Sequence, residues 1–291
     1  MKKKFLYILN PVSGRGIDRN TIFESLRDIT GGSQLEVFET KGKNETDRIR
    51  EKIQKGNPDE ILIGGGDGTI RMVASALQNS DIPLGIIPIG SANGLAKCLG
   101  INDIDDALRA VKSGETRKLD VLKIDGELCL HLSDFGFNAG LIKKFEEEET
   151  ERGMMAYFRS SLRQFQEMKP YTFGININGK KESKVEAKML VIANGDRYGT
   201  GAIINPASKI DDGKFEIIAL NPDGIDEMVE ISMAMFTGTL DETENVTIYS
   251  AEKANIINYD DADFQVDGEI IDAQKEIDVI CEKQKFRFLT S

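Results

Sequence analysis

Short apolar runs and amphipathic stretches alternate along the first 120 residues of the chain. The apolar runs predict buried strands at residues 5–9, 35–38, 61–63 and 84–89. Apolar positions three or four residues apart predict helices between them, at residues 22–29, 46–54, 70–77 and 92–99. Strands that alternate with helices are typical of a parallel sheet covered by helices, so we expect an α/β domain.

The pattern changes near Asp120, after which strand patterns follow one another. Asp125-Gly126 and Asn178-Gly179 are turn signals of the kind that join antiparallel strands. The expected strands are residues 121–124, 128–132, 171–177, 185–193, 215–220, 246–250, 254–257 and 276–281. Two helical patterns interrupt them, at about residues 153–168 and 225–236.

The chain length of 291 residues is enough for two ordinary domains. We predict an α/β domain with a parallel sheet over residues 1–122. A mostly antiparallel, β-sandwich-like domain should follow over residues 123–282. We leave open that a last strand, about residues 283–291, returns to the first domain.

Charge and hydropathy exclude several classes of protein. The chain has 37 basic and 49 acidic residues, a net charge of −12. Because nucleic-acid binding requires a basic footprint, we expect no nucleic-acid partner. The apolar run at residues 5–9 is shorter than the roughly 7–15 residues of a secretory signal. No run approaches the roughly 18–20 residues that span a bilayer, so we expect a cytoplasmic protein.

Cysteine and histidine usage excludes two further classes of site. The three cysteines, Cys98, Cys129 and Cys281, are far apart, and no C-x-x-C motif exists. Neither a zinc site nor a disulfide framework is therefore indicated. His131 is the only histidine, which argues against a histidine-based or zinc hydrolase, and we expect it to be structural.

Residues 64–69, Gly-Gly-Gly-Asp-Gly-Thr, are the strongest chemical signal. They lie between a predicted buried strand and a predicted helix. Glycines let the backbone pass close to a bulky anion, and a helix start offers free N–H groups to it. Asp67 would be repelled by a polyphosphate unless a divalent cation lay between them, so it indicates Mg²⁺. The open alternative is a tight turn in which Asp67 or Thr69 caps the helix.

Two similar loops follow other strands of the predicted parallel sheet. Residues 10–16 read Asn-Pro-Val-Ser-Gly-Arg-Gly, and residues 88–94 read Pro-Ile-Gly-Ser-Ala-Asn-Gly. Ser91 and Asn93 can contact phosphate or ribose, or cap the next helix instead. Loops at the carboxyl ends of parallel strands meet at one edge of a sheet. Three such loops together favour a nucleotide site over three plain turns.

The three motifs N-P-x-S-G, G-G-D-G-T and G-S-x-N-x-L-A, in this order, resemble the diacylglycerol kinase catalytic-domain family. That family includes bacterial lipid kinases and the sphingosine kinases. The resemblance continues through I-A-N-G at 192–195, N-P-A at 205–207, D-D-G at 211–213 and D-G-E at 267–269. It covers nearly the whole chain. It implies a nucleotide domain like that of NAD kinases and diacylglycerol kinases, and an ATP- and Mg²⁺-dependent lipid kinase, a phosphotransferase with an alcohol group as acceptor.

The resemblance also assigns residues to roles. The ATP site comprises Asn10, Pro11, Val12, Ser13, Gly14, Thr40, Gly65, Gly66, Asp67, Gly68, Thr69, Arg71, Ser91 and Asn93. A structural Mg²⁺ would be held by Asp212 and the carbonyls of Lys209 and Lys214, where a plain turn is the alternative. Glu269, Asp267 and Asp67 are the implied catalytic residues, and the alternative for residues 267–269 is an Asp-Gly turn.

The acceptor stays open between a diacylglycerol-like lipid and a sphingoid long-chain base. Many bacterial diacylglycerol kinases of the family carry Asp where this chain has Gly94, and the N-G-L-A form is closer to long-chain-base kinases. One alternative is a soluble-substrate kinase such as an NAD kinase, because G-G-D-G occurs there too. Another is a non-catalytic nucleotide or lipid sensor, which Gly94 favours.

A helical apolar stripe predicted within residues 153–168 has two interpretations. Met154, Met155, Phe158, Leu162 and Phe165 share one face. This face either meets a lipid surface or packs on the second domain. We expect the lipid substrate to be met at the membrane surface, by a protein transiently peripheral to the inner membrane face. A homodimer stays open.

Overall fold

The computed structural model describes residues 2–14, 18–31, 33–42, 45–77, 80–136, 168–198, 201–272 and 274–290. The chain divides into two compact units. The first holds the chain up to Val121, its end from Lys283, and Gly201; the second holds the rest. Each unit is described separately.

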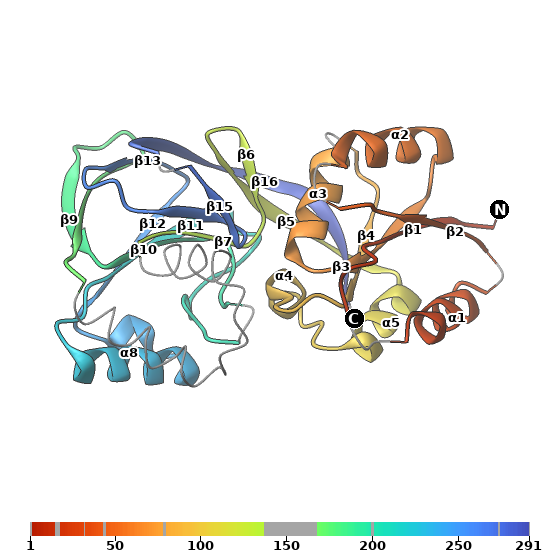
Figure 1. The fold of residues 1–291 in the computed structure, drawn as a ribbon, viewed down its shortest axis with the longest axis horizontal. Helices are drawn as coiled ribbons and strands as arrows, with labels where there is room; N and C mark the ends of the chain where they lie inside the picture. The colour runs from red at the N-terminus through yellow and green to blue at the C-terminus, as the bar shows by residue number, and fades with distance from the viewer. Residues whose placement is uncertain are drawn as a thin grey trace. The chain divides into compact units, whose positions relative to one another are not determined.

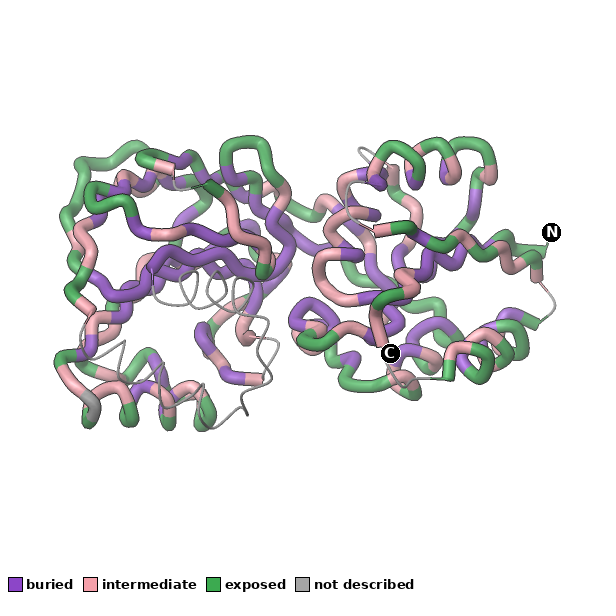
Figure 2. The backbone as a smooth tube through the Cα atoms, in the orientation of Figure 1, coloured by how far each residue is buried: buried purple, intermediate pink, exposed green. Residues whose placement is uncertain are grey.

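A parallel sheet forms the centre of the first unit (Figure 1). Its strands β1 (Lys4–Leu9), β2 (Gln34–Glu39), β3 (Glu60–Gly65) and β4 (Leu84–Pro88) have the order β2-β1-β3-β4. All neighbouring pairs run parallel. Strands β1, β3 and β4 are buried almost throughout, as Figure 2 shows, because helices cover the sheet. The α/β prediction is confirmed.

Helices follow the strands of this sheet. They are α1 (Arg19–Ile29), α2 (Thr46–Gly56), α3 (Asp67–Leu77), α4 (Gly94–Cys98) and α5 (Ile104–Ser113). Helices α2 and α3 lie on one side of the sheet, and α1 and α5 on the other (Figure 1). Helix α5 was not expected, although Asp103 caps its start and Gly114, with a φ of 66°, ends it.

The second unit is a sandwich of antiparallel strands. One sheet has the order β12-β11-β10-β7-β14-β15. Its strands are β7 (Leu132–Gly136), β10 (Met189–Ala193), β11 (Phe215–Leu220), β12 (Val246–Ala251), β14 (Phe264–Val266) and β15 (Glu269–Ile271). The other layer joins β9 (Ser183–Ala187), β8 (Tyr171–Ile177), β13 (Lys253–Asn258) and the first half of β16 (Glu276–Thr290).

Apolar side chains from both layers form the core of this sandwich. Phe135 and Phe264 of one sheet stack with their ring centroids 4.2 Å apart, and Phe173 of the other layer lies 5.5 Å from Phe135. A second cluster, on the other face of the β10-containing sheet, packs against Ile231 and Ala234 of α8 (Ile225–Thr237). A short 3₁₀ turn, η1 (Leu240–Glu242), follows α8. The antiparallel, sandwich-like prediction is confirmed.

Strands β5 (Glu115–Ile124) and β16 each contribute residues to both units. Strand β5 forms a hairpin with β6 (Glu127–Cys129) through the expected Asp125-Gly126 turn. Strand β16 is much longer than the predicted residues 276–281. Its first half pairs with β13, and Phe288 near its end pairs in parallel with Leu84 of β4.

Three expected elements differ from the structure. The predicted strand 128–132 is two strands, because the chain breaks between β6 and β7. The predicted strand 185–193 also breaks, at Lys188, whose N–H donates to the carbonyl of Leu220. The predicted helix at about 153–168 lies outside the described residues, apart from its last residue.

Candidate functional site

The expected nucleotide-binding residues lie where four parallel strands of the first unit end. Residues 10–14 follow β1, Thr40 follows β2, residues 66–69 follow β3, and residues 89–93 follow β4. Parallel strands place their carboxyl ends at one edge of the sheet. The structure therefore brings these segments together at that edge.

The loop after β1 is held by backbone and side-chain hydrogen bonds. The N–H of Asn10 donates to the carbonyl of Gly64 at 2.8 Å, and its side-chain amide donates to the hydroxyl of Thr69 at 3.2 Å. The Arg19 guanidinium, from α1, donates to the carbonyl oxygens of Pro11 and Ser13. The loops after β1 and β3 are thus fixed to each other. Sequence reasoning missed Arg19, whose only signal was its position just after the loop.

The loops after β3 and β4 touch backbone to backbone. A Cβ added to Gly90 would lie 2.3 Å from the Cα of Gly66, and one added to Gly66 would lie 3.2 Å from the Cα of Gly90. Asn93 stabilises this contact, because its side-chain oxygen accepts the N–H of Gly90 and its amide donates to the carbonyl of Gly90, both at 2.9 Å. Any side chain at Gly90 would force the loops apart. Asn93 therefore has a structural task here.

Asp67 caps a helix other than its own. Its two carboxylate oxygens accept the N–H groups of Gly94 at 2.8 Å and Leu95 at 3.0 Å, at the start of α4. A carboxylate at a helix start is stabilised by the free N–H groups and the helix dipole. Asp67 is therefore a helix cap, as the alternative interpretation proposed, but it caps α4 and not the helix that follows it directly in the sequence. Gly94, at the position considered above for the choice of acceptor, is one of the two donors.

Thr40 carries a buried polar atom. The residue is 2% exposed, and its hydroxyl has no hydrogen-bond partner among the described residues. Its backbone N–H donates to the carbonyl of Leu9 at 2.9 Å, which fixes it beside the end of β1. Such a hydroxyl can accept from or donate to a ligand group. Ser91 is exposed, and Arg71 is half-buried on α3.

In the second unit, residues 267–269 form the turn and first residue of the β14–β15 hairpin. Asp267 and Gly268 have φ angles of 48° and 84°, as a two-residue turn of this kind requires. The Asp267 carboxylate accepts the N–H groups of Leu130 and His131, each at 2.9 Å. It thereby holds the break between β6 and β7. Glu269 is half-buried at the start of β15.

His131 is buried between β6 and β7, not within a strand. Its ring Nε2 lies against the carbonyl of Arg197, and because a carbonyl only accepts, Nε2 carries the proton. The backbone N–H groups of Asn194 and Gly195 donate to the carbonyl of His131 at 3.0 and 3.1 Å. His131 thus links Asp267, which accepts its backbone N–H, to the I-A-N-G segment, which donates to its carbonyl.

Lys209, Asp212 and Lys214 belong to one exposed turn before β11. The N–H of Asp212 donates to the carbonyl of Lys209 at 3.3 Å, and the Asp212 carboxylate accepts the N–H of Lys214 at 3.0 Å. Burial raises the pKa of the nearby Glu216, the Asp212 carboxylate raises it further, and hydrogen bonds from Asn205 and Ser250 oppose the shift.

No group of three or more histidine, cysteine, aspartate or glutamate residues that could hold a metal ion occurs in the part of the chain that the structure describes. A Mg²⁺ ion that arrives with a nucleotide takes most of its ligands from phosphates and water, and one or two protein carboxylates are enough. Asp67 keeps further lone pairs beyond its two hydrogen bonds, so its position fits such an ion.

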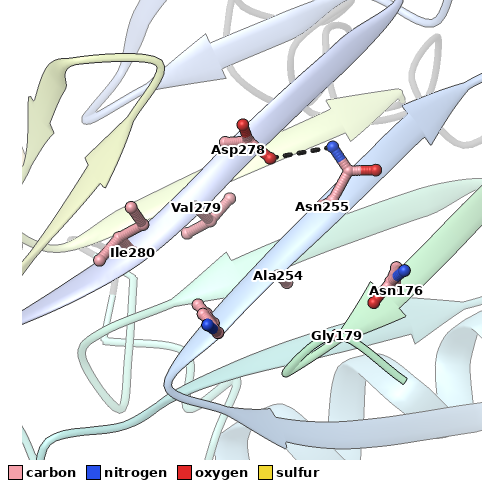
Figure 3. A pocket seen from close by; sticks show the side chains of 8 residues that line it. Asn176, Gly179, Ala254, Asn255, Asp278, Val279 and Ile280 are labelled. Atoms are coloured by element: carbon pink, nitrogen blue, oxygen red, sulfur yellow. Dashed lines mark hydrogen bonds between the residues drawn. The ribbon is translucent and has the colours of Figure 1, made fainter.

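A pocket of about 340 Å³ lies on the outer face of strands β8, β13 and β16 (Figure 3). The side-chain amide of Asn255 donates to Glu276 and Asp278, each at 2.9 Å, across neighbouring strands. None of the residues expected to bind ATP or a metal lines this pocket. The described residues also contain no helix that is long and apolar enough to cross a membrane.

Two family models match the chain. The diacylglycerol kinase catalytic domain matches residues 4–124, and the YegS C-terminal NAD kinase beta sandwich-like domain matches residues 133–280. The first match covers most of the first unit, and the second covers most of the sandwich.

Curated relatives show modest identity over nearly the whole chain. A probable lipid kinase YegS-like from Citrobacter koseri is 27% identical over 93% of this chain and 90% of its own. A diacylglycerol kinase from Bacillus subtilis is 23% identical over 97% and 98%. The uncharacterized protein sll0036 from Synechocystis is 29% identical over 91% of this chain, which spans 65% of that protein's length.

Solved structures share the fold. A diacylglycerol kinase from Bacillus anthracis superposes with a TM-score of 0.73 at 20% identity, covering 99% of this chain and 97% of its own. An NAD kinase from Archaeoglobus fulgidus in complex with ATP has a TM-score of 0.55 at 16% identity, covering 98% and 93%. At these identities the likeness describes the fold alone.

Proposed function

Because the chain belongs to the family of the diacylglycerol kinase catalytic domain with a YegS-type C-terminal domain, we propose that it transfers the γ-phosphate of ATP to a lipid hydroxyl. The observation that carries the proposal is the sheet edge of the first unit. There, hydrogen bonds join the loop after β3 to the loops after β1 and β4. Gly66 and Gly90 bring the loops after β3 and β4 into backbone contact. Such glycine-lined backbone lets a polyphosphate approach closely.

ATP binds to the residues of this edge. The loop of residues 10–14 and the segment 65–69 present backbone to the phosphates, with Arg71 adding a positive charge. The hydroxyl of Thr40, for which the described residues provide no hydrogen-bond partner, supplies a hydrogen bond to the nucleotide. Ser91, exposed at the neighbouring loop, reaches phosphate or ribose, and Asn93 keeps that loop in shape.

Mg²⁺ accompanies the nucleotide, with Asp67 as the protein carboxylate near it. When bound, the ion neutralises charge on the phosphates during in-line transfer. Asp67 also keeps α4 in place through the two hydrogen bonds to Gly94 and Leu95. A second, structural Mg²⁺ at the turn of Lys209, Asp212 and Lys214 stays a prediction.

The D-G-E segment supplies the base that accepts the proton of the lipid hydroxyl. Of its two acids, Glu269 is the better candidate. The Asp267 carboxylate accepts the backbone N–H groups of Leu130 and His131, each at 2.9 Å, so its oxygens are already engaged in holding the backbone. Asp267 then shapes the segment that carries Glu269.

The acceptor is a lipid with a hydroxyl group in reach of the site, either diacylglycerol-like or a sphingoid base. Gly94 leaves room and removes a negative charge relative to the aspartate of many bacterial diacylglycerol kinases. This difference favours a sphingoid base or another single-chain lipid as the acceptor. A comparison of kcat/KM among lipids in the same micelles decides between them.

The lipid is met at a membrane surface, and α8 offers an apolar contact to it. Val229, Met233 and Phe236 are 48%, 64% and 73% exposed, and their spacing puts them on one face of the helix. Residues 231–240 contain no charged side chain. Large exposed apolar side chains gathered on one face mark a surface for a lipid or protein partner. Contact of this kind would make the protein transiently peripheral to the membrane.

Vesicle sedimentation tests this contact. Met233→Ser with Phe236→Ser should reduce binding to phosphatidylcholine vesicles, whereas Ile280→Ser, at another exposed apolar position, should not. Equal binding of both variants and the wild type would contradict a role of α8 at the membrane. If the double variant instead changes oligomeric state in gel filtration, the face is a dimer contact.

NAD kinase activity is the second candidate, because an NAD kinase structure shares the fold. Incubation with γ-labelled ATP and, in parallel, NAD, sphingosine, monoacylglycerol and diacylglycerol separates the two. We expect label in the organic phase that depends on Mg²⁺ and is lost in Glu269→Gln. Label in NADP alone would replace the proposed function, and ATP binding without transfer to any acceptor would indicate a sensor.

A further inference from the structure

A buried polar pair lies directly behind the D-G-E turn in the second unit. Asp134 of β7 and Gln265 of β14 are opposite each other in the register of the sheet and are 0% and 2% exposed. The Gln265 amide nitrogen donates to a carboxylate oxygen of Asp134. Neither residue belongs to the motifs that indicated the site.

The other end of the Gln265 amide holds the turn. Its oxygen accepts the N–H of Gly268 at 2.6 Å, and the hydroxyl of Ser133 donates to the backbone carbonyl of Gln265, also at 2.6 Å. Gly268 is the second residue of the turn that places Glu269 on β15. The contacts therefore run from Asp134, through one side-chain amide, to the backbone next to Glu269.

The carboxylate of Asp134 fixes the direction of this amide. An amide can turn over, which would point its NH₂ group at the N–H of Gly268 and leave two donors facing each other. A carboxylate accepts but does not donate, so it keeps the NH₂ group on its own side and the oxygen on the turn. Burial followed by the Asp134 charge raises the pKa of Tyr198, which places this phenol near the same carboxylate.

We propose that Gln265, oriented by Asp134, is a positioning residue for the D-G-E segment. The proposal rests on the proposed function in one respect, namely that this segment contains the catalytic Glu269. Burying a carboxylate is costly unless it is hydrogen-bonded. The Gln265 amide supplies one such hydrogen bond to Asp134 and at the same time holds the N–H of Gly268. Small displacements of a reacting group reduce turnover by up to roughly 100-fold.

The test swaps the amide and the carboxylate between positions 265 and 134. Gln265→Glu still accepts the N–H of Gly268 but faces Asp134 with a second carboxylate. Adding Asp134→Asn restores a donor between the two positions, so the introduced amide can donate to the introduced carboxylate while that carboxylate still accepts from Gly268. Asp134→Asn alone is the second single variant of this double-mutant cycle, because its amide can accept from or donate to Gln265 and so no longer selects one orientation.

We expect Gln265→Glu to lower kcat for lipid phosphorylation by about 10- to 100-fold, with KM for ATP within about twofold of wild type. Asp134→Asn offers Gln265 a donor as well as an acceptor and no longer fixes the direction of its amide, so it should lower kcat by up to about tenfold. The double variant should recover to within about threefold of wild type, since the two positions act as a coupled pair. Wild-type kcat in Gln265→Glu would overturn the proposal. So would a folded double variant that is no more active than Gln265→Glu.

Amide hydrogen exchange at Gly268 provides a readout that is independent of catalysis. Its N–H should exchange faster in Gln265→Met, which offers no acceptor, and at the wild-type rate in the double variant. Equal protection in Gln265→Met and wild type would refute the positioning role. If the wild-type protein phosphorylates no lipid while these exchange rates follow the prediction, the proposed function fails and the positioning of the turn stands.

Discussion

Asp67→Asn separates the two tasks that we give to this carboxylate. Both of its oxygens accept helix-start N–H groups, from Gly94 at 2.8 Å and Leu95 at 3.0 Å. Asparagine keeps one acceptor oxygen and turns an NH₂ group toward the other N–H. One hydrogen bond to α4 is therefore lost, and the negative charge near the nucleotide is lost with it.

The size of the effect follows from these contacts. A hydrogen bond to a charged group contributes about 1.5–3 kcal/mol, and removing a helix cap costs about 0.5–2 kcal/mol. The site is only partly buried, so water compensates for some of the loss. We expect the free energy of unfolding of the first unit to fall by about 1–2 kcal/mol. Turnover should fall by roughly 100-fold, the effect of removing one preorganised electrostatic group.

The assay combines steady-state kinetics with amide exchange. Turnover is measured at saturating ATP and Mg²⁺, and exchange is followed at Gly94 and Leu95. Asp103→Asn is the matched control, because Asp103 caps α5 by accepting the N–H of Asp106 at 2.8 Å and is not among the expected nucleotide-binding residues. Wild-type turnover in Asp67→Asn, or an equal loss in Asp103→Asn, would refute the role of Asp67 at the nucleotide. Unchanged exchange at both amides would refute its role as the cap of α4.

Three further predictions concern separate positions. Glu216 has a pKa raised above its ordinary value of 4.5, so its contribution to stability is fully present below pH 4.5 and should be lost as the pH rises through the raised pKa. Glu216→Gln should remove this decline, measured as the urea-unfolding midpoint against pH. Parallel pH curves for both proteins would contradict it. If Asp212 holds a structural cation, a chelator should lower the melting temperature of the wild type, Mg²⁺ should restore it, and Asp212→Ala should respond to neither, whereas an unchanged wild-type curve leaves a plain turn. Gly94→Asp should shift the ranking of kcat/KM from sphingoid bases toward diacylglycerol, and a uniform loss on all lipids would show that the position does not select the acceptor.

The sequence was sufficient where local pattern decides the structure. The apolar runs of β1, β3 and β4 predicted buried parallel strands, because a strand covered on both faces carries apolar residues at every position. The position of the loops after those strands predicted that residues 10–16, 64–69 and 88–94 would meet at one edge. Helix α5 could also have been predicted, since Asp103 and Gly114 are local start and stop signals.

Distant contacts account for what the sequence did not predict. Residues 128–132 look like one strand, but Asp267 accepts N–H groups of Leu130 and His131 and interrupts it from 137 and 136 residues away. The break at Lys188 also involves distant contacts, because its N–H donates to the carbonyl of Leu220 and its carbonyl oxygen lies against Gly136, where an added Cβ would come within 2.4 Å. No local sequence pattern predicts the contacts of Asp267 or those of Lys188.

The interpretation of Asp67 was incomplete for the same reason. A carboxylate in a glycine-rich loop indicated a cation, and the sequence offered its own helix as the alternative capping site. In the structure, both carboxylate oxygens of Asp67 accept N–H groups of α4, which begins 27 residues later. Likewise, the motif at residues 267–269 did not indicate that the Asp267 carboxylate accepts the N–H groups of Leu130 and His131, and a catalytic role of Asp267 stays a prediction.

The most direct test of the account is phosphoryl transfer from γ-labelled ATP to a total lipid extract from the source organism, with purified wild-type protein. We predict a labelled lipid in the organic phase that requires Mg²⁺ and is reduced by roughly 100-fold with Asp67→Asn. Label that stays entirely in the aqueous phase, with NAD added and converted to labelled NADP, would contradict the assignment as a lipid kinase.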